Sequence, residues 1–434
     1  MTSSPHKMKD VFIIDGNRTP FLKVRGKPGP FTASDLAVYA GRSLLSRQPF
    51  QPSDLDEVII GCVMPNTDEV NIGRVIGLRL GCGKKVPGMT VQRNCASGLQ
   101  SIDTAANLIQ LGKANLILAG GTDAMSHASL LFNHQMVNWL SDLNSAKNWK
   151  HKIKTIAAFR PHFLKPIISL LRGLTDATIN LNMGQTAEIL ADKFNISRTE
   201  MDTFALQSHD RLASAVDQKF MSEITPIYDA YGKYYEEDDG LRRDSSLEKL
   251  AKLQPFFDKK FGKVTAANSS QITDGAAMIL LASHDAVEKY QLPVLAKIVD
   301  SQWAGVDPRQ MGLGPVHAIA PILQRQYLSL DKIDCIEINE AFATQVLACI
   351  RALQDEKYCQ EELGLEKAVG EIDQSKLNID GGAIAIGHPI GASGTRVLLH
   401  TAKTLKRLQK KWGIASLCIG GGQGGAMLIE NVED

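Results

Sequence analysis

The stretch from 95 to 125, CASGLQSIDTAANLIQLGKANLILAGGTDAM, occurs again in altered form from 391 to 427, as GASGTRVLLHTAKTLKRLQKKWGIASLCIGGGQGGAM. The triplet Ala-Ser-Gly at 96–98 aligns with the same triplet at 392–394. In both copies the small residues are followed by apolar residues at helical spacing and then by an apolar run that ends in glycines. Each copy is therefore predicted to form a helix that leads into a strand.

A second pair of similar segments lies in the same order along the chain. LDEVIIGCVMP begins at Leu55, and IDCIEINEAFA begins at Ile333. Helix starts rich in glycine and alanine can recur by chance, but two matched pairs in one order indicate a duplicated α/β fold. Strands that alternate with amphipathic helices predict a mostly parallel sheet. Functional groups are then expected at helix starts and beyond the carboxyl ends of strands, where the two halves face each other.

Length and composition limit the class of protein. The chain has 434 residues, enough for two or three structural units, and its net charge of +1 gives no reason to expect a nucleic-acid partner. The seven cysteines are scattered without a CxxC pair, which predicts no disulfide framework, no zinc site and a reducing compartment. The opening residues MTSSPHKMKD lack a signal-peptide pattern, and no apolar run is long enough to cross a membrane. We therefore expect a cytoplasmic protein.

The segment between the two copies, from 126 to 254, has a different character. No acidic residue lies between Asp142 and Asp176, whereas basic and apolar residues are interleaved there. Such a stretch suits a membrane surface or a partner protein, and equally a solvated helix over the domain or a lid over a substrate that carries phosphates. Farther on, Ser197 and Glu200 form a capping-box pattern between two predicted helices. The basic residues are Lys147, Lys150, Lys152, Lys154, Arg160, Lys165 and Arg172.

Cys95 and His388 are the first candidates for chemistry, although lone cysteines and histidines are more often structural. Cys95 stands just before a predicted helix, where unpaired N–H groups and the helix dipole favour a thiolate. His388 stands between Gly387 and Pro389, directly before the second copy of the helix start. If the halves pack about a pseudo-twofold axis, the two helix starts face each other. The imidazole then comes within hydrogen-bond reach of the sulfur and can activate it.

Two further strings carry polar groups at the ends of predicted strands. Cys418 precedes the glycines 420–422, whose N–H groups could form an oxyanion hole. Asn339 and Glu340 follow the apolar run CIEI and precede an apolar helix. That position is typical of a functional site and equally of an ordinary helix cap.

Taken in order, NCASG, VTAANSSQITDGAAMIL, NEAFA, GGAIAIGHPIGASGTR and CIGGGQGGAM resemble the sequence blocks of the thiolase family over essentially the whole chain. The resemblance implies an α/β fold of two duplicated βαβαβαββ halves, stacked in five α-β-α-β-α layers, with an inserted loop domain. The first half is expected to comprise residues 1–125 and 255–292, the loop domain 126–254, and the second half 293–434.

The resemblance also implies roles for single residues. Cys95 looks like the nucleophile that takes the acyl group as a thioester, His388 like the base that activates it, and Cys418 like the second acid/base at the acetyl carbon. Asn339 would hold a water that, with His388, stabilises the oxygen of the thioester enolate. The backbone N–H groups of Cys95 and Gly420 would form the other oxyanion hole.

Coenzyme A is implied as a co-substrate, with no metal and no prosthetic group. Ser270, Arg242 and Arg243 stand where relatives contact coenzyme A. Cys418 and Asn339 favour thiolases over the decarboxylating ketosynthases, which pair a cysteine with two histidines. The long basic insertion is most like the β-subunits of trifunctional fatty-acid-oxidising complexes and their bacterial counterparts, although those β-subunits commonly have a histidine in place of Asn339.

The expected function is that of an acetyl-CoA C-acyltransferase in fatty-acid β-oxidation, which cleaves a 3-ketoacyl-CoA with coenzyme A. The alternative is an acetoacetyl-CoA thiolase that condenses two acetyl-CoA molecules with the same residues; a non-catalytic lipid-CoA carrier is a remote third. The resemblance implies a homodimer or homotetramer and a hydratase/dehydrogenase α-subunit as a partner. The basic insertion adds a peripheral membrane contact through 133–174.

Overall fold

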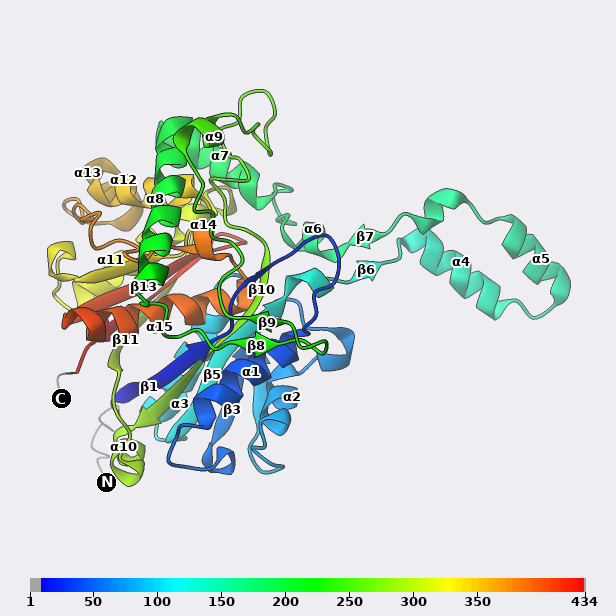
Figure 1. Cartoon of the computed structure of the whole chain (residues 1–434). Helices are drawn as coiled ribbons and strands as arrows, with labels where there is room; N and C mark the ends of the chain where they lie inside the picture. Colours follow the sequence, from blue (N-terminus) through cyan, green and yellow to red (C-terminus); the bar gives the residue numbers. More distant parts are fainter. Residues whose placement is uncertain (1–8, 433–434) are drawn as a thin grey trace, which may run out of the picture.

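The two halves of the chain share one mixed sheet, which helices flank (Figure 1). The computed structural model describes residues 9–432. Within them the sheet contains ten strands in the order β12-β13-β14-β11-β1-β10-β5-β3-β4, with β2 paired to β10. The strands are β1 (Val11–Arg18), β2 (Leu22–Lys23), β3 (Glu57–Gly61), β4 (Gly88–Val91), β5 (Leu116–Ala124), β10 (Thr273–Ser283), β11 (Ala296–Gly305), β12 (Cys335–Ile338), β13 (Trp412–Ile419) and β14 (Gln423–Glu430).

Strand pairing repeats from one half to the other, as the duplicated sequence predicts. In the first half β3 pairs parallel with β5, whereas β5 with β10 and β10 with β1 are antiparallel. In the second half β12 pairs parallel with β13, whereas β13 with β14 and β14 with β11 are antiparallel. The two halves join where residues 11–13 of β1 pair with residues 296–298 of β11.

One side-chain contact is repeated as well. Asp56, just before β3, accepts hydrogen bonds at 2.6 and 2.9 Å from the N–H groups of residues 115–116, at the start of β5. Asp334, just before β12, accepts hydrogen bonds at 3.1 and 3.0 Å from the N–H groups of residues 411–412, at the start of β13. The duplication therefore extends from strand order to single hydrogen bonds.

The expectation of a mostly parallel sheet is wrong. Among the described strands of this sheet, only β3 with β4, β3 with β5, and β12 with β13 run parallel. Each half ends in a strand that returns antiparallel beside its predecessor: β14 follows β13 after the glycines 420–422, and β10 follows β5 after the long insertion. A connection as short as three glycines can join only antiparallel strands, and the sequence analysis did not use that signal.

Helices form three layers, two outside the halves of the sheet and one between them (Figure 1). An apolar core fills each interface between a helix layer and a half of the sheet. The α-β-α-β-α layering implied by the sequence is confirmed. The first outer layer contains α1 (Ala33–Leu45) and α2 (Ile72–Arg79), the central layer α3 (Ser97–Gln110) and α15 (Ile390–Leu408), and the second outer layer α11 (Gly314–Arg325) and α12 (Ala343–Gln354).

The two central helices touch backbone to backbone at the glycines of the repeated Ala-Ser-Gly triplet. A Cβ atom on Gly98 would lie 2.6 Å from the carbonyl oxygen of Gly391, and one on Gly394 would lie 2.4 Å from the amide nitrogen of Leu99. Neither space can hold a side chain, because real Cβ atoms essentially never approach other atoms within 3.0 Å. The repeated glycines thus bring the starts of α3 and α15 together at the centre of the molecule.

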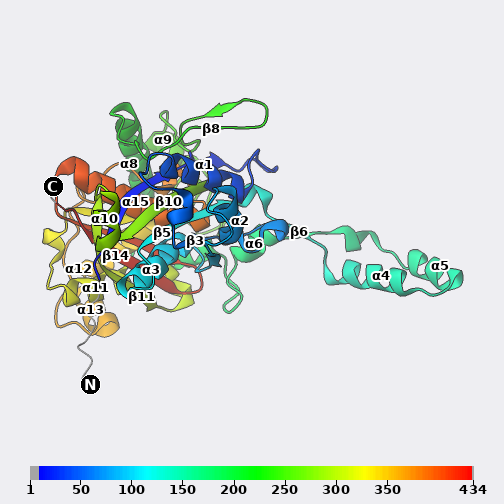
Figure 2. The ribbon, with the colours of Figure 1, turned by 90° about the horizontal axis from the view of Figure 1, so that it is seen from below.

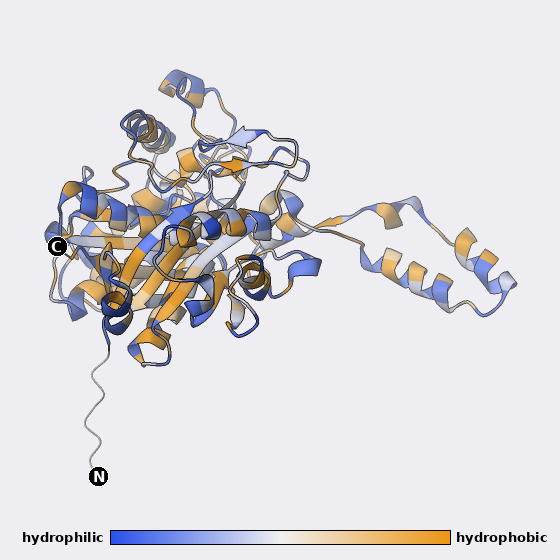
Figure 3. Cartoon of the chain, turned by 60° about the horizontal axis from the view of Figure 1, so that its bottom comes forward, coloured by the Kyte–Doolittle hydropathy of each residue, from blue (hydrophilic) through white to orange (hydrophobic). Residues whose placement is uncertain are grey.

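The insertion between β5 and β10 includes an arm that projects from the body in both views (Figures 1 and 2). It leaves through β6 (Leu130–Leu131), carries α4 (His134–Ser145) and α5 (Trp149–Ala157) at its far end, and returns through β7 (Ile167–Ile168). Hydrophobic and hydrophilic residues alternate along the arm (Figure 3). In residues 9–432 no helix has the length and apolar character needed to span a membrane.

The other elements of the chain complete the body. The predicted capping box of Ser197 and Glu200 is confirmed at the start of α8, where each side chain bonds to the backbone N–H of the other residue. The remaining elements are α6 (Ser169–Gly173), α7 (Met183–Lys193), α8 (Arg198–Asp217), β8 (Ile227–Tyr228), β9 (Tyr234–Tyr235), α9 (Leu247–Ala251), α10 (His284–Tyr290), α13 (Glu356–Leu363) and α14 (Ala383–Ile386).

A buried ionic cluster ties the insertion to both halves. Arg18 on β1 forms ion pairs with Glu223 (3.4 Å) and Asp238 (2.6 Å), which belong to the insertion. His400 on α15 lies 3.0 Å from Glu223 and 3.0 Å from Asp380. Burial opposes the charge on His400, but the Glu223 and Asp380 carboxylates prevail and raise the pKa of the imidazole to about 10.

We expect the variant His400→Gln to be destabilised by about 3 kcal/mol near pH 6, because breaking a buried ion pair leaves carboxylates without their partner. The folded-state pKa of His400 lies above its ordinary 6.5, so this stabilisation is complete below pH 6.5 and is lost as the pH rises through about 10. Urea unfolding of both proteins at about pH 6, 8 and 10 measures it: the difference in unfolding free energy should shrink as the pH rises. A difference in unfolding free energy that does not change with pH would contradict the raised pKa of His400.

Candidate active site

Cys95 lies in the turn between β4 and α3, immediately before the N-cap of the helix, as the sequence predicts. The preceding residue, Asn94, has a left-handed backbone (φ 42°), and its side-chain NH₂ donates a 2.8 Å hydrogen bond to the carbonyl oxygen of Gly420. The turn that carries Cys95 is therefore bound directly to the glycine turn between β13 and β14 of the other half.

The thiol of Cys95 is held in its neutral form. Burial raises its pKa above the ordinary value, and hydrogen bonds to the sulfur from the N–H groups of Gly420 and of Cys95 itself offset only part of that effect. The expectation of a thiolate at the helix start therefore does not hold for the resting protein. A base is needed to remove the proton, because the thiolate is the nucleophilic form.

His388 is placed and oriented by the loop before α15. Gly387 has φ 114°, and a Cβ atom there would lie 2.4 Å from Thr273 Cγ2, so only glycine fits. The imidazole Nδ1 lies 2.6 Å from Ser393 Oγ, and the Ser393 hydroxyl donates to the carbonyl oxygen of Pro389 at 3.0 Å. Because the hydroxyl has one proton, Nδ1 must be the donor to Ser393 Oγ. The unprotonated nitrogen is then Nε2.

The His388 imidazole is neutral, and one of its ring nitrogens is free in the described part of the chain. Burial, and then the charge of Arg396, lower its pKa to about 4, so the ring is neutral at physiological pH. Its Nε2 atom is buried and has no hydrogen-bond partner within residues 9–432. A neutral imidazole with a free ring nitrogen is the form that a general base requires.

Cys418 is the penultimate residue of β13 and is buried among apolar side chains that include Met311 and Phe342. Burial and the neighbouring Cys95 raise the pKa of its thiol well above the ordinary value. Cys95, His388 and Cys418 line one cavity of about 170 Å³. The structure thus brings Cys95 together with His388 and Cys418, which lie about 300 residues farther along the chain. The other walls are mainly apolar and include Met125, Leu174, Met183, Phe257, Ile272, Phe342 and Ile390.

Asn339 and Glu340 directly precede Ala341 and Phe342, which line the cavity, but they are not themselves among the lining residues. Both amide atoms of Asn339 are buried without a hydrogen-bond partner in the described part of the chain. Glu340 accepts hydrogen bonds from Ser208 Oγ (2.7 Å), Asn378 Nδ2 (2.8 Å) and the N–H of Ile384 (3.1 Å). Glu340 therefore fixes the Asn339 turn to the loop that leads to His388.

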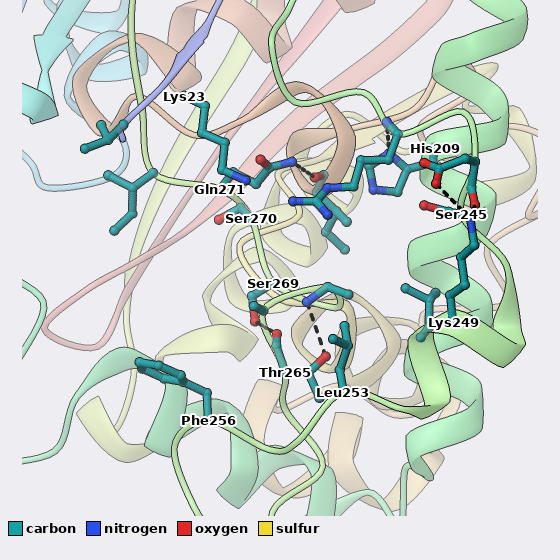
Figure 4. A pocket seen from close by; sticks show the side chains of 18 of the residues that line it. Lys23, His209, Ser245, Lys249, Leu253, Phe256, Thr265, Ser269, Ser270 and Gln271 are labelled. Carbon is teal, nitrogen blue, oxygen red and sulfur yellow. Dashed lines mark hydrogen bonds and ion pairs between the residues drawn. The ribbon is translucent and has the colours of Figure 1, made fainter. Parts of the chain in front are cut away.

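A larger cleft of about 650 Å³ adjoins the cavity (Figure 4). The two spaces share Phe257 and residues 269–272 as walls, and Ser270, predicted from the sequence, belongs to both. Lys23 and Arg242 bring positive charge to the cleft, whereas Lys249 forms an ion pair with Asp244 (2.7 Å), which also lines it. Burial, and then the charges of Arg242 and Arg25, lower the pKa of Lys23.

The two predicted arginines lie in different places. Arg242 lines the cleft, where its backbone N–H donates to His209 Nδ1 at 3.3 Å. Arg243 is not among the lining residues and forms an ion pair with Asp217 (2.8 Å). The motifs of the sequence do not predict Lys23, Lys249 or His209, because each comes from a separate segment and none belongs to a motif.

In residues 9–432 no group of three or more His, Cys, Asp or Glu side chains could hold a metal ion. All seven cysteines are free thiols.

The sequence matches the models of one family over nearly the whole chain. Residues 11–285 match the family described as "Thiolase, N-terminal domain", and residues 292–431 match "Thiolase, C-terminal domain". The chain belongs to the thiolase family.

Individual relatives support this assignment. The chain is 39% identical to "3-ketoacyl-CoA thiolase, mitochondrial" of Homo sapiens over 98% of its length and 99% of the relative's. It is 34% identical to "Trifunctional enzyme subunit beta, mitochondrial" of Mus musculus over 99% of its length and 90% of the relative's. Among solved structures, human mitochondrial 3-ketoacyl-CoA thiolase in complex with CoA superposes with a TM-score of 0.85 at 37% identity, covering 98% of this chain and 99% of that one. Acetyl-CoA acetyltransferase of Bacillus anthracis also gives 0.85, at 34% identity over 98% and 100%.

Proposed function

We propose that this thiolase is an acetyl-CoA C-acyltransferase of fatty-acid β-oxidation, which cleaves a 3-ketoacyl-CoA with coenzyme A into acetyl-CoA and a shortened acyl-CoA. The observation that carries the proposal is the shared cavity of Cys95, His388 and Cys418 beside a basic cleft. A thiol nucleophile, a neutral imidazole and a second thiol are the groups that this carbon–carbon cleavage needs. The relatives named 3-ketoacyl-CoA thiolase support the same reaction.

The first half-reaction cleaves the substrate. His388 Nε2 takes the proton of Cys95, and the sulfur attacks the keto carbon. The bond to the α-carbon breaks, the acyl group stays on Cys95 as a thioester, and the acetyl-CoA enolate takes a proton from the Cys418 thiol. The enolate oxygen is stabilised by His388, now protonated, and by a water held at Asn339. The unpartnered buried amide of Asn339 supports that role.

The second half-reaction releases the shortened acyl-CoA. After the proton on His388 passes to the Cys418 thiolate, the imidazole is again neutral and takes the proton of an incoming coenzyme A thiol. The coenzyme A sulfur attacks the thioester, and the developing oxyanion is stabilised by the N–H groups of Cys95 and Gly420. The same two N–H groups act to lower the pKa of the Cys95 thiol in the resting protein, which supports this role. His388 then returns its proton to Cys95 as the sulfur leaves.

The division of labour between the thiols can be tested in the two half-reactions. We expect Cys95→Ser to lose acyl transfer, because a hydroxyl is a much poorer nucleophile. Cys418→Ala should still accept an acetyl group from acetyl-CoA on Cys95, whereas its thiolysis of a 3-ketoacyl-CoA should fall by about a thousandfold or more. Mass spectrometry detects the acyl-enzyme, and steady-state kinetics measures thiolysis.

Cys335→Ala serves as the control, since Cys335 is buried but lies outside the cavity. The rate of thiolysis by the Cys335→Ala variant should match that of the unaltered protein. Equal loss of acylation and cleavage in Cys418→Ala would argue against separate roles, and full turnover in Cys95→Ser would end the proposed mechanism.

The neighbouring arginines offer a test of coenzyme A binding. We propose that the cleft holds coenzyme A, with Ser270 and Arg242 among its contacts, because phosphates favour a site with unpaired positive charge. Arg242→Ala should raise the KM for coenzyme A by about tenfold, which corresponds to about 1.4 kcal/mol of binding energy. Arg243→Ala, one residue away but paired with Asp217, should change it by less than about twofold. Equal effects of the two substitutions would place the phosphates elsewhere.

We further propose a membrane contact for the arm. Trp149, Ile153 and Ile156 on α5 are 68%, 57% and 56% exposed, and lysines at 150, 152 and 154 lie between them. Exposed apolar side chains interleaved with lysines suit an anionic lipid surface.

Vesicle co-sedimentation tests the arm. We expect the protein to pellet with vesicles that contain anionic lipid, and the triple variant Lys150→Glu, Lys152→Glu, Lys154→Glu to stay in the supernatant, because each lysine near the surface contributes about 1 kcal/mol. Lys84→Glu with Lys85→Glu is the matched control, since these exposed lysines lie on the body of the first half. If the triple variant and the control pellet equally, the arm does not bind the membrane, and its role is to contact a partner protein or to act as a lid.

The assembly and the compartment of the protein are further proposals. We propose a homodimer or homotetramer, because β4 is an edge strand that pairs only with β3 in the described part of the chain. A hydratase/dehydrogenase α-subunit is a further proposed partner, supported by the likeness to a trifunctional enzyme subunit beta. The free thiols support a reducing compartment and the proposed cytoplasmic location, whereas the mammalian relatives are named as mitochondrial.

The domain division also remains a proposal. We assign residues 1–125 with 255–292 to the first half, 126–254 to the loop domain and 293–434 to the second half. The pairing of β10 with both β5 and β1 supports the return of the chain to the first half after the insertion.

A further inference from the structure

A carboxylate at the end of β5 is buried where the two halves meet. Asp123 is fully buried and accepts hydrogen bonds from the N–H groups of Val63 (3.2 Å), Met64 (2.9 Å) and Gly391 (2.6 Å), and from the Cys62 thiol (3.3 Å). Residues 62–64 follow β3 of the first half, and Gly391 lies in the first turn of α15 in the second. One side chain thus binds loops from both halves of the duplicated fold.

Asp123 is held by dipoles rather than by a cation. Within residues 9–432 it forms no ion pair with a lysine, arginine or histidine. Backbone N–H groups and the positive end of α15, a helix of 19 residues, stabilise its charge. Burial still raises its pKa to about 6, so the group is charged near neutral pH. A buried charge without a counter-ion is costly, and a role in the site would explain why it is present.

The contact with Gly391 leaves no room for adjustment. A Cβ atom on Gly391 would lie 2.7 Å from Asp123 Oδ2, and one on Gly121 would lie 1.9 Å from the carbonyl oxygen of Gly391. The carbonyl oxygen of Gly391 also faces Gly98 at the start of α3, in the contact between the two central helices. The position of Gly391 is therefore fixed from both sides.

Gly391 is connected to the proposed base through one helical turn. The N–H groups of Ala392 and Ser393 donate to the carbonyl oxygen of Pro389 at 2.9 and 3.0 Å, which closes the first turn of α15 around Gly391. Ser393 Oγ in turn accepts the proton of His388 Nδ1 and so orients the imidazole. A shift of Gly391 must move Ser393, and with it the direction of His388 Nε2.

We propose that Asp123 is a positioning residue of the thiolase reaction: by binding the N–H of Gly391 and the loop at 62–64, it fixes the first turn of α15 and thereby the imidazole of His388 relative to Cys95. The inference rests on the proposed role of His388 as the base. Asp123 itself touches neither reacting sulfur through a hydrogen bond in the structure.

The isosteric variant Asp123→Asn tests the proposal. Its amide places an NH₂ group among N–H donors, so one of the bonds must be lost and the turn must shift. We expect kcat for thiolysis to fall by about 10- to 100-fold, since small displacements of a catalytic group cost that much, while the KM for coenzyme A changes by less than about twofold. Asp56→Asn is the matched control, because Asp56 also binds two backbone N–H groups beside β5 and lies outside the site. Its kcat should be unchanged.

A double-mutant cycle distinguishes positioning from general loss of structure. Ser393→Ala should lower kcat by itself, because His388 Nδ1 loses its acceptor. If both residues act through the same imidazole, adding Asp123→Asn to Ser393→Ala should lower kcat by a further factor of less than about three. Multiplicative losses would overturn the proposal, as would full kcat in Asp123→Asn.

Folding and function are controlled separately. Should Asp123→Asn not fold, Asp123→Glu replaces it: this variant keeps the charge but must displace Gly391, and it should show the same loss of kcat with an unchanged KM. Full kcat in Asp123→Glu would overturn the proposal. If the unaltered protein neither forms an acyl-enzyme nor cleaves a 3-ketoacyl-CoA, the proposed function fails instead. If it does both and only the expected effects of Asp123 are missing, this inference alone fails.

Discussion

The close contact of α3 and α15 is the constraint on which the site depends. Helices with ordinary side chains pack with their axes 8–10 Å apart, but here backbone meets backbone at Gly98 and Gly394. That approach lets the turn before each helix reach the same cavity, so Cys95 and His388 become neighbours. The small residues of the repeated triplet are therefore a packing requirement of the site, and a side chain at either glycine would separate the halves.

Burial dominates the electrostatics of the cavity. It raises the pKa of both Cys95 and Cys418 and lowers the pKa of His388, so all three groups are neutral at rest. The helix start and the N–H of Gly420 reduce the cost of a thiolate without making it the resting form. Charge then develops only when the bound substrate makes proton transfer from Cys95 favourable. The apolar walls also limit the access of water to the thioester.

The sequence alone predicted the parts of the structure that local pattern encodes. The duplication and the meeting of Cys95 with His388 follow from repeated motifs and from the rule that helix starts face each other in such folds, whereas the layers and the role of Cys418 were implied by the resemblance to the thiolase family. The direction of the strands was harder to predict, because the long insertion separates β10 from β5 in the sequence although the two strands are neighbours in the sheet. Arg242 and Arg243 are adjacent in sequence, yet only the first lines the cleft, since rotation about the backbone decides which side chain faces it.

Residues that act through tertiary contacts were beyond the reach of motif reading. Lys23, His209 and Asp123 come from three separate segments, and nothing in their local sequence marks them. Glu340 was noted beside Asn339, but its bonds to Ser208, Asn378 and Ile384 appear only when α8 and the loop before His388 are packed together. The role of such a residue depends on the side chains and backbone groups that contact it, and those contacts form only in the folded structure.

The asymmetry of the repeat has a consequence for how this molecule can evolve. Alignment of the two Ala-Ser-Gly triplets sets Gly391 opposite Cys95, and the space that a side chain at 391 would need is filled by the carboxylate of Asp123 and the carbonyl oxygen of Thr122. The first half therefore carries a thiol at this position of the repeat, whereas the second half carries a glycine that its packing requires. A single substitution at 391 cannot add a second nucleophile there, because the new side chain would collide with Asp123.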